Sequence, residues 1–362
     1  MLHAALIGFP SSGKTTLFRL MTSAREAPKG RGDIDIGISR VPDDRLDRLT
    51  AMYNPRKRVP ATVEFTDPIA PARTGAQGLV DVAGYRNADA LVHVVRAFRD
   101  DRVPHPAGAV DAPRDAQAME DELILADLGV AERRLERIEK DLRKGRSTDL
   151  ERERDVVLQC KDALEEGRPL RTLQLAGDDV KRLRGFQFLS AKPLLLVINL
   201  GEGDLAGTGA DIGKAAERTG LTGVLAHAAT KVVALCARIE LEISQLEGED
   251  AAAFLSDLGL TESGLERVIR TSYDLLGYMS FFTVGEDECR AWSIARGTPA
   301  LLAAGEIHSD IQRGFIRAEV VAYDALMSRG SMAACREHGE VRLEGKDYIV
   351  RDGDIINVRH AT

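Results

Sequence analysis

The sequence predicts an α/β protein with a largely parallel sheet, interrupted by an antiparallel helical hairpin and followed by a small module rich in strands. Three observations support this class. Short apolar runs recur between longer helical patterns, a heptad seam follows the third run, and alternating segments close the chain. One run alone could be a turn of buried helix, but several runs interleaved with helices are typical of buried parallel strands. The runs are Leu2–Ile7, Val63–Phe65, Leu91–Val95, Leu194–Ile198 and Val232–Cys236.

Composition limits the possible classes of protein. The 362 residues are 44% hydrophobic and 29% charged, which is ordinary for a soluble globular protein of two or three domains. No apolar run approaches the roughly 18 residues of a membrane helix, and Leu2–Ile7 lacks the basic leader of a secretory signal. The net charge of −8 argues against a globally basic nucleic-acid binder, so any RNA contact has to be local. The four cysteines show no CxxC spacing, so we expect a reducing cytoplasm and neither a zinc site nor disulfides.

The first strand runs into Gly8–Thr15, which reads Gly-Phe-Pro-Ser-Ser-Gly-Lys-Thr and matches the P-loop pattern. Such a loop wraps phosphates with backbone N–H groups, and the helix after it directs its positive end toward them. Gly8 and Gly13 permit the close approach of backbone that a Cβ would hinder. Lys14 is expected to reach the β and γ phosphates, and Thr15 to offer its hydroxyl to Mg²⁺. A nucleotide site is favoured over a glycine-rich turn with a surface lysine.

Asp67 is the predicted second ligand of the metal. A Mg²⁺-nucleotide site also needs an acidic residue at the end of a neighbouring strand, and Asp67 ends the run that begins at Val63. Thr15 and Asp67 are therefore the expected Mg²⁺ ligands and, with Lys14, the expected catalytic group. An Asp before Pro68 could equally open a turn.

Base recognition is expected from the loops after two later strands. One loop is Asn199–Glu202, and the other begins at Cys236 and Ala237. Guanine-specific P-loop proteins typically present Asn-Lys-x-Asp in the first loop, whereas here Leu200 replaces the Lys and Glu202 the Asp. Glu202 is one methylene too long for the same grip on guanine, so the sequence favours adenine. The short match is also compatible with a loop that does not touch the base.

A helical hairpin is predicted over residues 115–184. The residues that predict its first helix are apolar and spaced by four and three, and those of the second form a weaker stripe after a break at Lys144–Ser147. They are Ile124, Leu128, Ala131, Leu135, Ile138 and Leu142, then Val157, Cys160 and Leu164. The many charges are either its solvated face or a lever for a large partner.

The last part of the chain, residues 279–362, is predicted to be rich in strands. Alternation predicts strands over Ser280–Val284, Cys289–Ile294, Tyr348–Val350 and Ile355–Val358, with a helical stretch between the second and third. His308 and Asp310 are interpreted as a structural pair rather than a metal site. Core packing is likewise favoured over RNA stacking for the aromatic side chains of this module. These are Trp292, Phe315 and Tyr323.

Several motifs along nearly the whole chain point to one family. They lie in the segments Gly8–Leu17, Val41–Leu46, Ala88–Ala90, His93–Arg96, Glu122–Asp127, Asn199–Glu202, Cys236–Glu240, Gly305–Ala318 and Glu344–Val350. With these motifs the chain resembles the YchF (Obg-like ATPase) subfamily of translation-associated P-loop NTPases. The resemblance implies a G domain over 1–114 and 185–278, the inserted hairpin, and a ubiquitin-like β-grasp (TGS) domain over 279–362. It further implies ATP preferred over GTP, slow Mg²⁺-dependent hydrolysis, and association with the ribosome and its RNA. Ser11, Ser12, Gly13, Lys14, Thr15 and Thr16 carry over as nucleotide contacts, and Leu200 as a base contact beside Asn199.

The sequence departs from the family pattern at three places. Lys29–Ile36 holds no Thr for the metal, so Asp33 or Asp35 is the expected substitute. The family's Asp-x-x-Gly becomes Asp67-Pro68-Ile69-Ala70 followed by Pro71, which predicts a stiff second switch. Ser11 replaces the usual Asn that helps to hold potassium in relatives, so we do not expect stimulation by K⁺.

Two functions remain open from the sequence. One is slow ATP hydrolysis linked to the ribosome, with Arg73 either a helper or a solvent-exposed loop residue. The other is a module that binds ATP without turnover, because Ala70 and Pro71 stand in the second switch. A small-molecule kinase is disfavoured, since no Arg-bearing lid is evident. We expect a cytoplasmic monomer without membrane or sequence-specific DNA partners, and GTP remains a second possible ligand.

Overall fold

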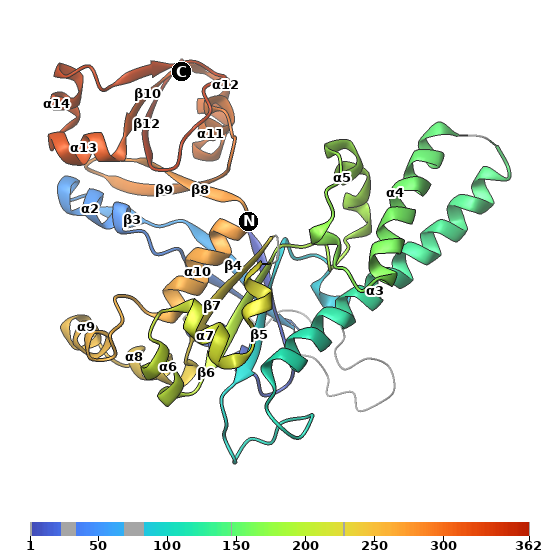
Figure 1. Cartoon of the computed structure of the whole chain (residues 1–362). Coiled ribbons are helices and arrows are strands. Elements are labelled where there is room, and N and C mark those ends of the chain that lie inside the picture. The colour runs from blue at the N-terminus through green and yellow to red at the C-terminus, as the bar shows by residue number, and fades with distance from the viewer. Residues whose placement is uncertain (1, 23–33, 69–82, 146, 227–228, 362) are drawn as a thin grey trace. The chain divides into compact units, whose positions relative to one another are not determined.

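The protein is described by a computed structural model that covers residues 2–22, 34–68, 83–145, 147–226 and 229–361 (Figure 1). These residues group into two compact units. The first lies within residues 3–38 and 64–275, and the second consists of residues 39–63 and 276–361 together with Leu2. The helical hairpin belongs to the first unit. The three-domain division stays a prediction, and the grouping of residues 39–63 with the C-terminal residues was not foreseen from the sequence.

The first unit is built on a six-stranded sheet with the order β2-β4-β1-β5-β6-β7. Each of the five apolar runs of the sequence lies in one of these strands, because a strand buried on both faces needs a continuous apolar segment. The pairs β1 with β4, β1 with β5, β5 with β6 and β6 with β7 are parallel. The bounds are β1 His3–Ile7, β2 Ile34–Arg40, β4 Thr62–Pro68, β5 Ala90–Ala97, β6 Leu194–Leu200 and β7 Thr230–Leu235.

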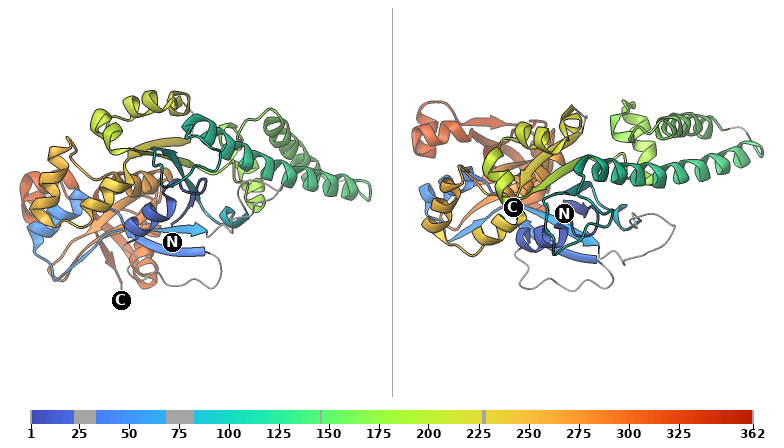
Figure 2. Two further views of the ribbon diagram at one scale, coloured as in Figure 1. Left: turned by 90° about the horizontal axis from the view of Figure 1, so that it is seen from below. Right: turned by 60° about the horizontal axis from the view of Figure 1, so that its bottom comes forward.

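Helices follow the strands of this sheet, as Figure 2 shows. The helix α1 (Lys14–Met21) leaves the P-loop, and the short helices α6 (Glu202–Thr208) and α8 (Ala237–Ile243) begin directly after β6 and β7. These starts place the ends of three strands and the beginnings of three helices around one candidate site. The other helices outside the hairpin are α5 (Gly177–Leu183), α7 (Ile212–Thr219), α9 (Gly248–Asp257) and α10 (Gly264–Leu275).

The predicted hairpin is present as α3 (Ala112–Leu142) and α4 (Thr148–Glu165), which lie side by side in both views of Figure 2. Side chains of the predicted seam are buried together with those of the second stripe. Near its first turns, α3 packs Met119 and Leu123 against Ala5 and Ile7 of β1. The helix is therefore anchored in the sheet at one end, while its other end forms the hairpin.

The second unit contains a sheet with the order β11-β10-β12-β8-β9-β3. Five of these strands come from the C-terminal part of the unit, and β3 comes from residues 39–63 and pairs in parallel with β9. The helix α2 (Asp44–Tyr53) of that segment buries Leu46 and Leu49 completely. The strands are β3 Lys57–Val59, β8 Tyr278–Thr283, β9 Glu288–Ala295, β10 Phe315–Ala322, β11 Arg342–Glu344 and β12 Asp354–His360, and the other helices are α11 Ala300–Ile307, α12 Ser309–Arg313, α13 Tyr323–Arg329 and α14 Met332–Glu337.

Two expectations for the second unit were wrong. Tyr348–Val350 is not a strand and makes only an isolated bridge between Ile349 and Pro299. The segment expected to be wholly helical contains β10, which pairs with both β11 and β12. Its pattern buries Ala318 and Val320 on one face, but it was masked by the helical segments on either side.

Most of the side chains expected to be structural in the second unit have structural contacts, but Tyr323 is only half-buried and its hydroxyl has no hydrogen-bond partner among the described residues. His308 accepts a hydrogen bond from the Asp310 backbone N–H at 3.1 Å and thereby caps α12. Trp292 donates from Nε1 to Thr283 Oγ1 at 2.9 Å and stacks on Phe281. Phe315 is buried in the core of the unit. These contacts leave the interpretation as core residues in place.

Candidate functional site

The P-loop has the backbone that phosphate binding requires. Gly8 and Gly13 have φ values of 143° and 99°, in the region that favours glycine. A Cβ at Gly8 would come within 2.5 Å of Val94 O, and one at Gly13 within 2.4 Å of Asn199 Nδ2. Ser11 is also left-handed, with a φ of 64°, a conformation that Asn adopts more readily than Ser. The loop is thus closely packed on β5 and β6 and cannot accept larger residues at its two glycines.

Lys14 folds back over this loop. Its Nζ donates to Gly8 O at 2.8 Å and to Phe9 O at 2.9 Å. Burial lowers the pKa of Lys14, an effect that the negative charge of Asp67 opposes. The ammonium group is therefore held at the loop itself, where P-loop lysines meet the β and γ phosphates.

Thr15 and Asp67, the predicted metal ligands, lie together. Thr15 Oγ1 donates to Asp67 Oδ2 at 2.8 Å, so helix α1 and strand β4 bring two oxygen atoms to one place. Burial raises the pKa of the Asp67 carboxyl, the hydrogen bond from Thr15 and the charge of Lys14 lower it, and the charge of Asp35 raises it again. Asp35, on β2, is half-buried. A hydroxyl with one or two carboxylates is a donor set that suits Mg²⁺.

Ser12 provides a further sign that the loop is built around a polar ligand. Its side chain is buried, and its Oγ has no hydrogen-bond partner within the part of the chain that the structure describes. Buried hydroxyls usually have a partner, because leaving one unsatisfied costs about 1 to 3 kcal/mol. Together with the two glycines that a Cβ would obstruct, this hydroxyl fits a loop that accommodates phosphate oxygens.

On the base side, Asn199 joins three segments. Its Nδ2 donates to Ser12 O at 2.9 Å, and its Oδ1 accepts from Ala237 N at 2.9 Å. Both ends of the amide are therefore used within the protein. Leu200 and Cys236 direct their side chains into the core beside the sheet, so only their backbone atoms are available to a base. The structure thus brings the predicted base-side residues together and gives Asn199 a bridging role.

Glu202 already has a partner. Its Oε1 lies 2.7 Å from Arg238 Nε, and both side chains are about half exposed or more, at 48% and 67%. Glu202 is the first residue of α6, and Arg238 lies in the first turn of α8. The ion pair thus connects the same two loops that Asn199 connects.

Comparisons with known proteins cover almost the whole chain. A curated protein named ribosome-binding ATPase YchF from Bacillus subtilis is 42% identical over 367 residues, covering 99% of both chains. Proteins of the same name from Haemophilus influenzae and Escherichia coli O157:H7 are 37% and 36% identical, covering 98% and 97% of this chain and of themselves. The chain belongs to the YchF family. Residues 278–361 match the family model YchF-GTPase_C, described as a protein of unknown function (DUF933).

A solved structure gives the same result for the fold. The Schizosaccharomyces pombe YchF GTPase matches with a TM-score of 0.84 and 29% identity, over 99% of this chain and 97% of that one. The predicted family and fold class are thereby confirmed. The individual nucleotide contacts and metal ligands of this YchF chain stay predictions, although the structure brings most of them to one place.

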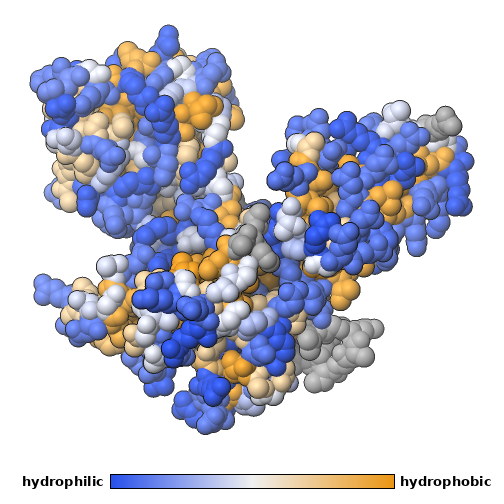
Figure 3. All heavy atoms as spheres, in the orientation of Figure 1, coloured by the Kyte–Doolittle hydropathy of each residue, from blue (hydrophilic) through white to orange (hydrophobic). Residues whose placement is uncertain are grey.

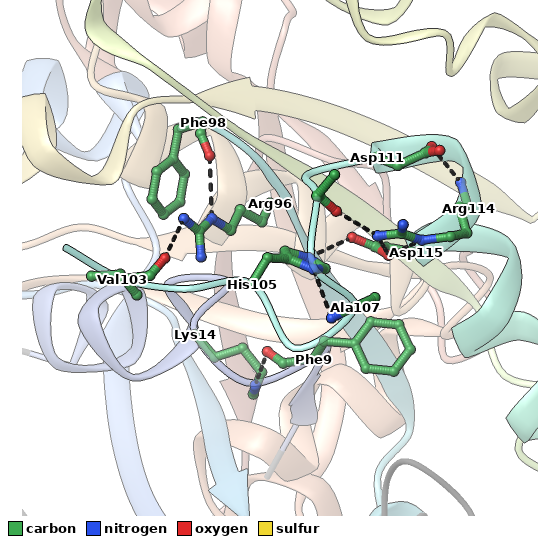
Figure 4. Close-up of polar contacts among 11 residues, drawn as sticks. Phe9, Lys14, Arg96, Phe98, Val103, His105, Ala107, Asp111, Arg114 and Asp115 are labelled. Carbon is green, nitrogen blue, oxygen red and sulfur yellow. Dashed lines mark hydrogen bonds and ion pairs between the residues drawn. The ribbon is translucent and has the colours of Figure 1, made fainter. Parts of the chain in front are cut away.

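A buried contact between His105 and Asp115 near this site could not be predicted from the sequence (Figure 4). His105 Nε2 lies 2.8 Å from Asp115 Oδ2, and both side chains are buried. The other ring nitrogen, Nδ1, accepts a hydrogen bond from Ala107 N at 3.1 Å. Arg114 Nη2 donates to the other oxygen of Asp115 at 2.8 Å. The pair fixes the segment between β5 and α3, and a lone His gives no signal of such a partner in the sequence.

Asp127 was matched as part of a family motif, but its role appears only in the structure. This fully buried carboxylate of α3 accepts from Leu189 N at 2.9 Å, and from Ser190 N and Oγ at 2.7 and 2.8 Å. Arg86 Nη1 lies 3.6 Å from Asp127 Oδ1. Burial raises the pKa of Asp127, and these hydrogen bonds oppose the rise. The hairpin is thus tied to the segment that leads into β6.

Some sequence predictions fall outside the residues that the structure describes. These are the stiffness of the second switch at Ala70 and Pro71, the helper role of Arg73, and the substitution by Asp33. Within the described ranges, no helix is both long and apolar enough to cross a membrane. The same residues include no cluster of three or more His, Cys, Asp or Glu side chains that could hold a metal. A Mg²⁺ ion bound with the phosphates of a nucleotide does not need such a cluster.

Proposed function

We propose that this chain binds Mg²⁺-ATP at its P-loop in preference to GTP, hydrolyses it slowly, and acts at the ribosome in the cytoplasm. The observation that carries the proposal is the hydrogen bond between Thr15 and Asp67 beside the P-loop, whose Gly8 carbonyl accepts from Lys14. The metal would be held by these two oxygens and the phosphates, and it would supply neutralisation of the charge on the phosphates. The names of the relatives support the ribosome as the partner.

The protein's own groups account for binding. Backbone N–H groups at the start of α1 meet the phosphates, and Lys14 adds a fixed positive charge. Asn199 holds the base-side loops against the P-loop, so the two ends of the ligand are recognised by one rigid assembly. Adenine is favoured because Glu202 is too long for the grip on guanine and is already paired.

Hydrolysis of the bound ATP depends on the second switch, where the sequence departs from the family pattern. A module that binds ATP without hydrolysis is the second candidate, favoured by Ala70 and Pro71 in the second switch. Steady-state release of phosphate from the wild type and from an Ala70→Gly/Pro71→Leu variant separates the two candidates. We expect the variant to be faster by about tenfold, since a switch that cannot rotate its peptide loses roughly one hydrogen bond to the γ-phosphate. Equal rates would contradict the stiff switch.

The ribosomal part of the proposal is supported by the charge at the end of the hairpin. Although the chain is acidic overall, residues 133–146 hold seven Lys or Arg and three Asp or Glu, a net charge of +4. Arg133, Arg137, Lys140 and Arg143 are exposed. Figure 3 shows the hairpin surface as mostly hydrophilic, with scattered apolar patches. Leu125 and Leu158 of the hairpin helices are exposed. A polar, basic end suits the phosphates of ribosomal RNA.

Sedimentation with ribosomes tests this surface. An Arg137→Glu/Arg143→Glu variant should lose at least about tenfold in affinity, and the loss should shrink as salt is raised. A matched control is Lys161→Glu/Arg168→Glu, which reverses two charges outside the end segment. Equal behaviour of the two variants would exclude the hairpin end as the contact.

A further inference from the structure

The ion pair between Glu202 and Arg238 has a consequence for the choice of base. Arg238 Nε lies 2.7 Å from Glu202 Oε1 and 4.0 Å from Glu242 Oε1, so its nearer partner is the residue that stands where a guanine-binding carboxylate would be. Glu242 is one helical turn from Arg238 on α8 and could hold the arginine without Glu202. The pairing with Glu202 therefore joins two loops rather than two turns of one helix.

The position of the pair is set by contacts on both sides. Asn199, three residues before Glu202, accepts from the N–H of Ala237, the residue next to Arg238. The same Asn199 donates to Ser12 of the P-loop. The loops that carry the pair are consequently held against each other and against the phosphate loop, which places the pair at the base end of the proposed nucleotide site.

The chemistry of the two bases makes the pairing selective. An ionised carboxylate can only accept hydrogen bonds. The edge of guanine presents two N–H donors side by side, whereas the corresponding edge of adenine presents one donor beside a ring nitrogen that itself accepts. Although it is one methylene longer than the Asp of guanine-specific proteins, a free Glu202 carboxylate would still be better matched to the two N–H donors of guanine than to adenine. A Glu202 held by an arginine has one carboxylate oxygen, Oε1, engaged and its charge compensated.

We propose that Arg238 is a specificity-determining residue that withholds the Glu202 carboxylate from guanine. This inference deepens the adenine preference proposed above and rests on it for the location of the base. It adds a cause: discrimination depends on the partner of Glu202 and not only on its length. Because the pair is exposed, its effect on affinity is a factor of a few.

The chain offers a matched control on the same helix. Asp204, two residues after Glu202, accepts from Arg218 Nε at 2.6 Å, and its side chain is about one third exposed. Arg218 lies on α7, and neither residue belongs to the two loops that Asn199 joins. Removing Arg218 breaks an ion pair of similar kind in the same turn of α6 without freeing Glu202.

The test is calorimetric titration of the Mg²⁺ complexes of ADP and GDP, with four full-length proteins. These are the wild type, Arg238→Ala, Arg238→Ala/Glu202→Ala and Arg218→Ala. We expect Arg238→Ala to lower the Kd for GDP about threefold to fivefold, the range set by an exposed ion pair, while the Kd for ADP stays within about twofold. Removing Glu202 as well should abolish the gain, and Arg218→Ala should change neither Kd.

Two results would overturn the inference. One is an unchanged Kd for GDP in Arg238→Ala. The other is a higher Kd for ADP with an unchanged Kd for GDP, which would mean that Arg238 contacts adenine directly. This test and the test of the base preference can fail separately. A wild type that binds GDP more tightly than ADP would refute the proposed adenine preference. The role of Arg238 is judged instead from the ratio of the GDP affinities of the variants to that of the wild type.

Discussion

The phosphate end and the base end of the candidate site differ in how their polar groups are used. At the phosphate end, Ser12 Oγ is buried without a partner among the described residues, and Lys14 rests on two carbonyls of its own loop. At the base end, both atoms of the Asn199 amide and the carboxylate of Glu202 are engaged by the protein. We infer that most of the affinity comes from contacts with the phosphates. The base end holds the loops of the site together, and it discriminates between bases because the Glu202 carboxylate is paired with Arg238.

The largest effect is expected at the phosphate end. Lys14→Ala should weaken binding of every nucleotide about 100-fold, because a charge-assisted contact with two phosphates is lost. Calorimetric titration measures this loss, and circular dichroism should show an unchanged fold. Lys192 gives a matched control, since its Nζ also donates to two carbonyls, those of Arg86 and Ala88, at 2.9 and 2.5 Å.

Lys192→Ala should therefore lower stability without changing nucleotide affinity. Both lysines have a pKa lowered mainly by burial, so the comparison is between similar environments. If the two variants lost affinity to the same extent, the special role of Lys14 would be disproved.

At the base end, Asn199→Ala should affect stability more than selectivity. The change leaves Ser12 O and Ala237 N without partners, which should cost about 1 to 3 kcal/mol in the free energy of unfolding. Urea denaturation measures that cost. The affinities for ATP and GTP should fall by the same factor, because the Asn199 amide bridges two segments of the protein and does not contact the base. A change in the ratio of the two affinities would instead mean that Asn199 reads the base.

The charged Asp67 carboxylate is expected to favour Mg²⁺ binding but to lower the stability of the fold. Because its folded pKa is raised above the ordinary value, mainly by burial, the charged form costs stability as pH rises from the unfolded pKa through the folded one. Asp67→Asn should therefore be more stable than the wild type at neutral pH, by less than about 1 kcal/mol, and equal to it in strong acid. Thermal unfolding at several pH values tests this.

The same variant should lose the dependence of nucleotide binding on Mg²⁺. In the wild type that dependence should fade on acidification at a higher pH than an ordinary Asp would give, since the raised pKa protonates Asp67 earlier. A wild type and an Asp67→Asn variant with the same Mg²⁺ dependence would rule out Asp67 as a ligand.

The smallest effect is expected at Ser11. Asn tolerates the left-handed conformation at this position better than Ser, so Ser11→Asn should raise stability by about 0.5 kcal/mol or less. The release of phosphate, compared in potassium and sodium salts, should be equal for the wild type and favour potassium in the variant. Stimulation of the wild type by potassium would contradict the role assigned to Ser11.

Much of the fold could be predicted from the sequence because local patterns of residues determine it. Five of the six strands of the first sheet, all except β2, and the hairpin follow from apolar runs and a heptad seam, which need no knowledge of distant partners. β3 could not be predicted, because Lys57–Val59 becomes a strand only by pairing with β9, more than two hundred residues later. β10 was hidden for a related reason, since its strand character depends on β11 and β12.

The candidate site shows the same division between local and distant information. The P-loop motif identified Lys14 and Thr15 from spacing alone, and the end of a strand identified Asp67. In contrast, the pairing of Glu202 with Arg238 and the His105–Asp115 pair join residues from different elements. Residue types at single positions could not reveal those partners, so the predicted adenine preference rested on the length of Glu202 and on Leu200 in place of the usual Lys.

Whether this P-loop binds adenine nucleotides in preference to guanine nucleotides is decided by calorimetric titration of the wild type with ATP, ADP, GTP and GDP in the presence of Mg²⁺. We expect a lower Kd for each adenine nucleotide than for its guanine counterpart. Tighter binding of GTP and GDP would refute the adenine preference.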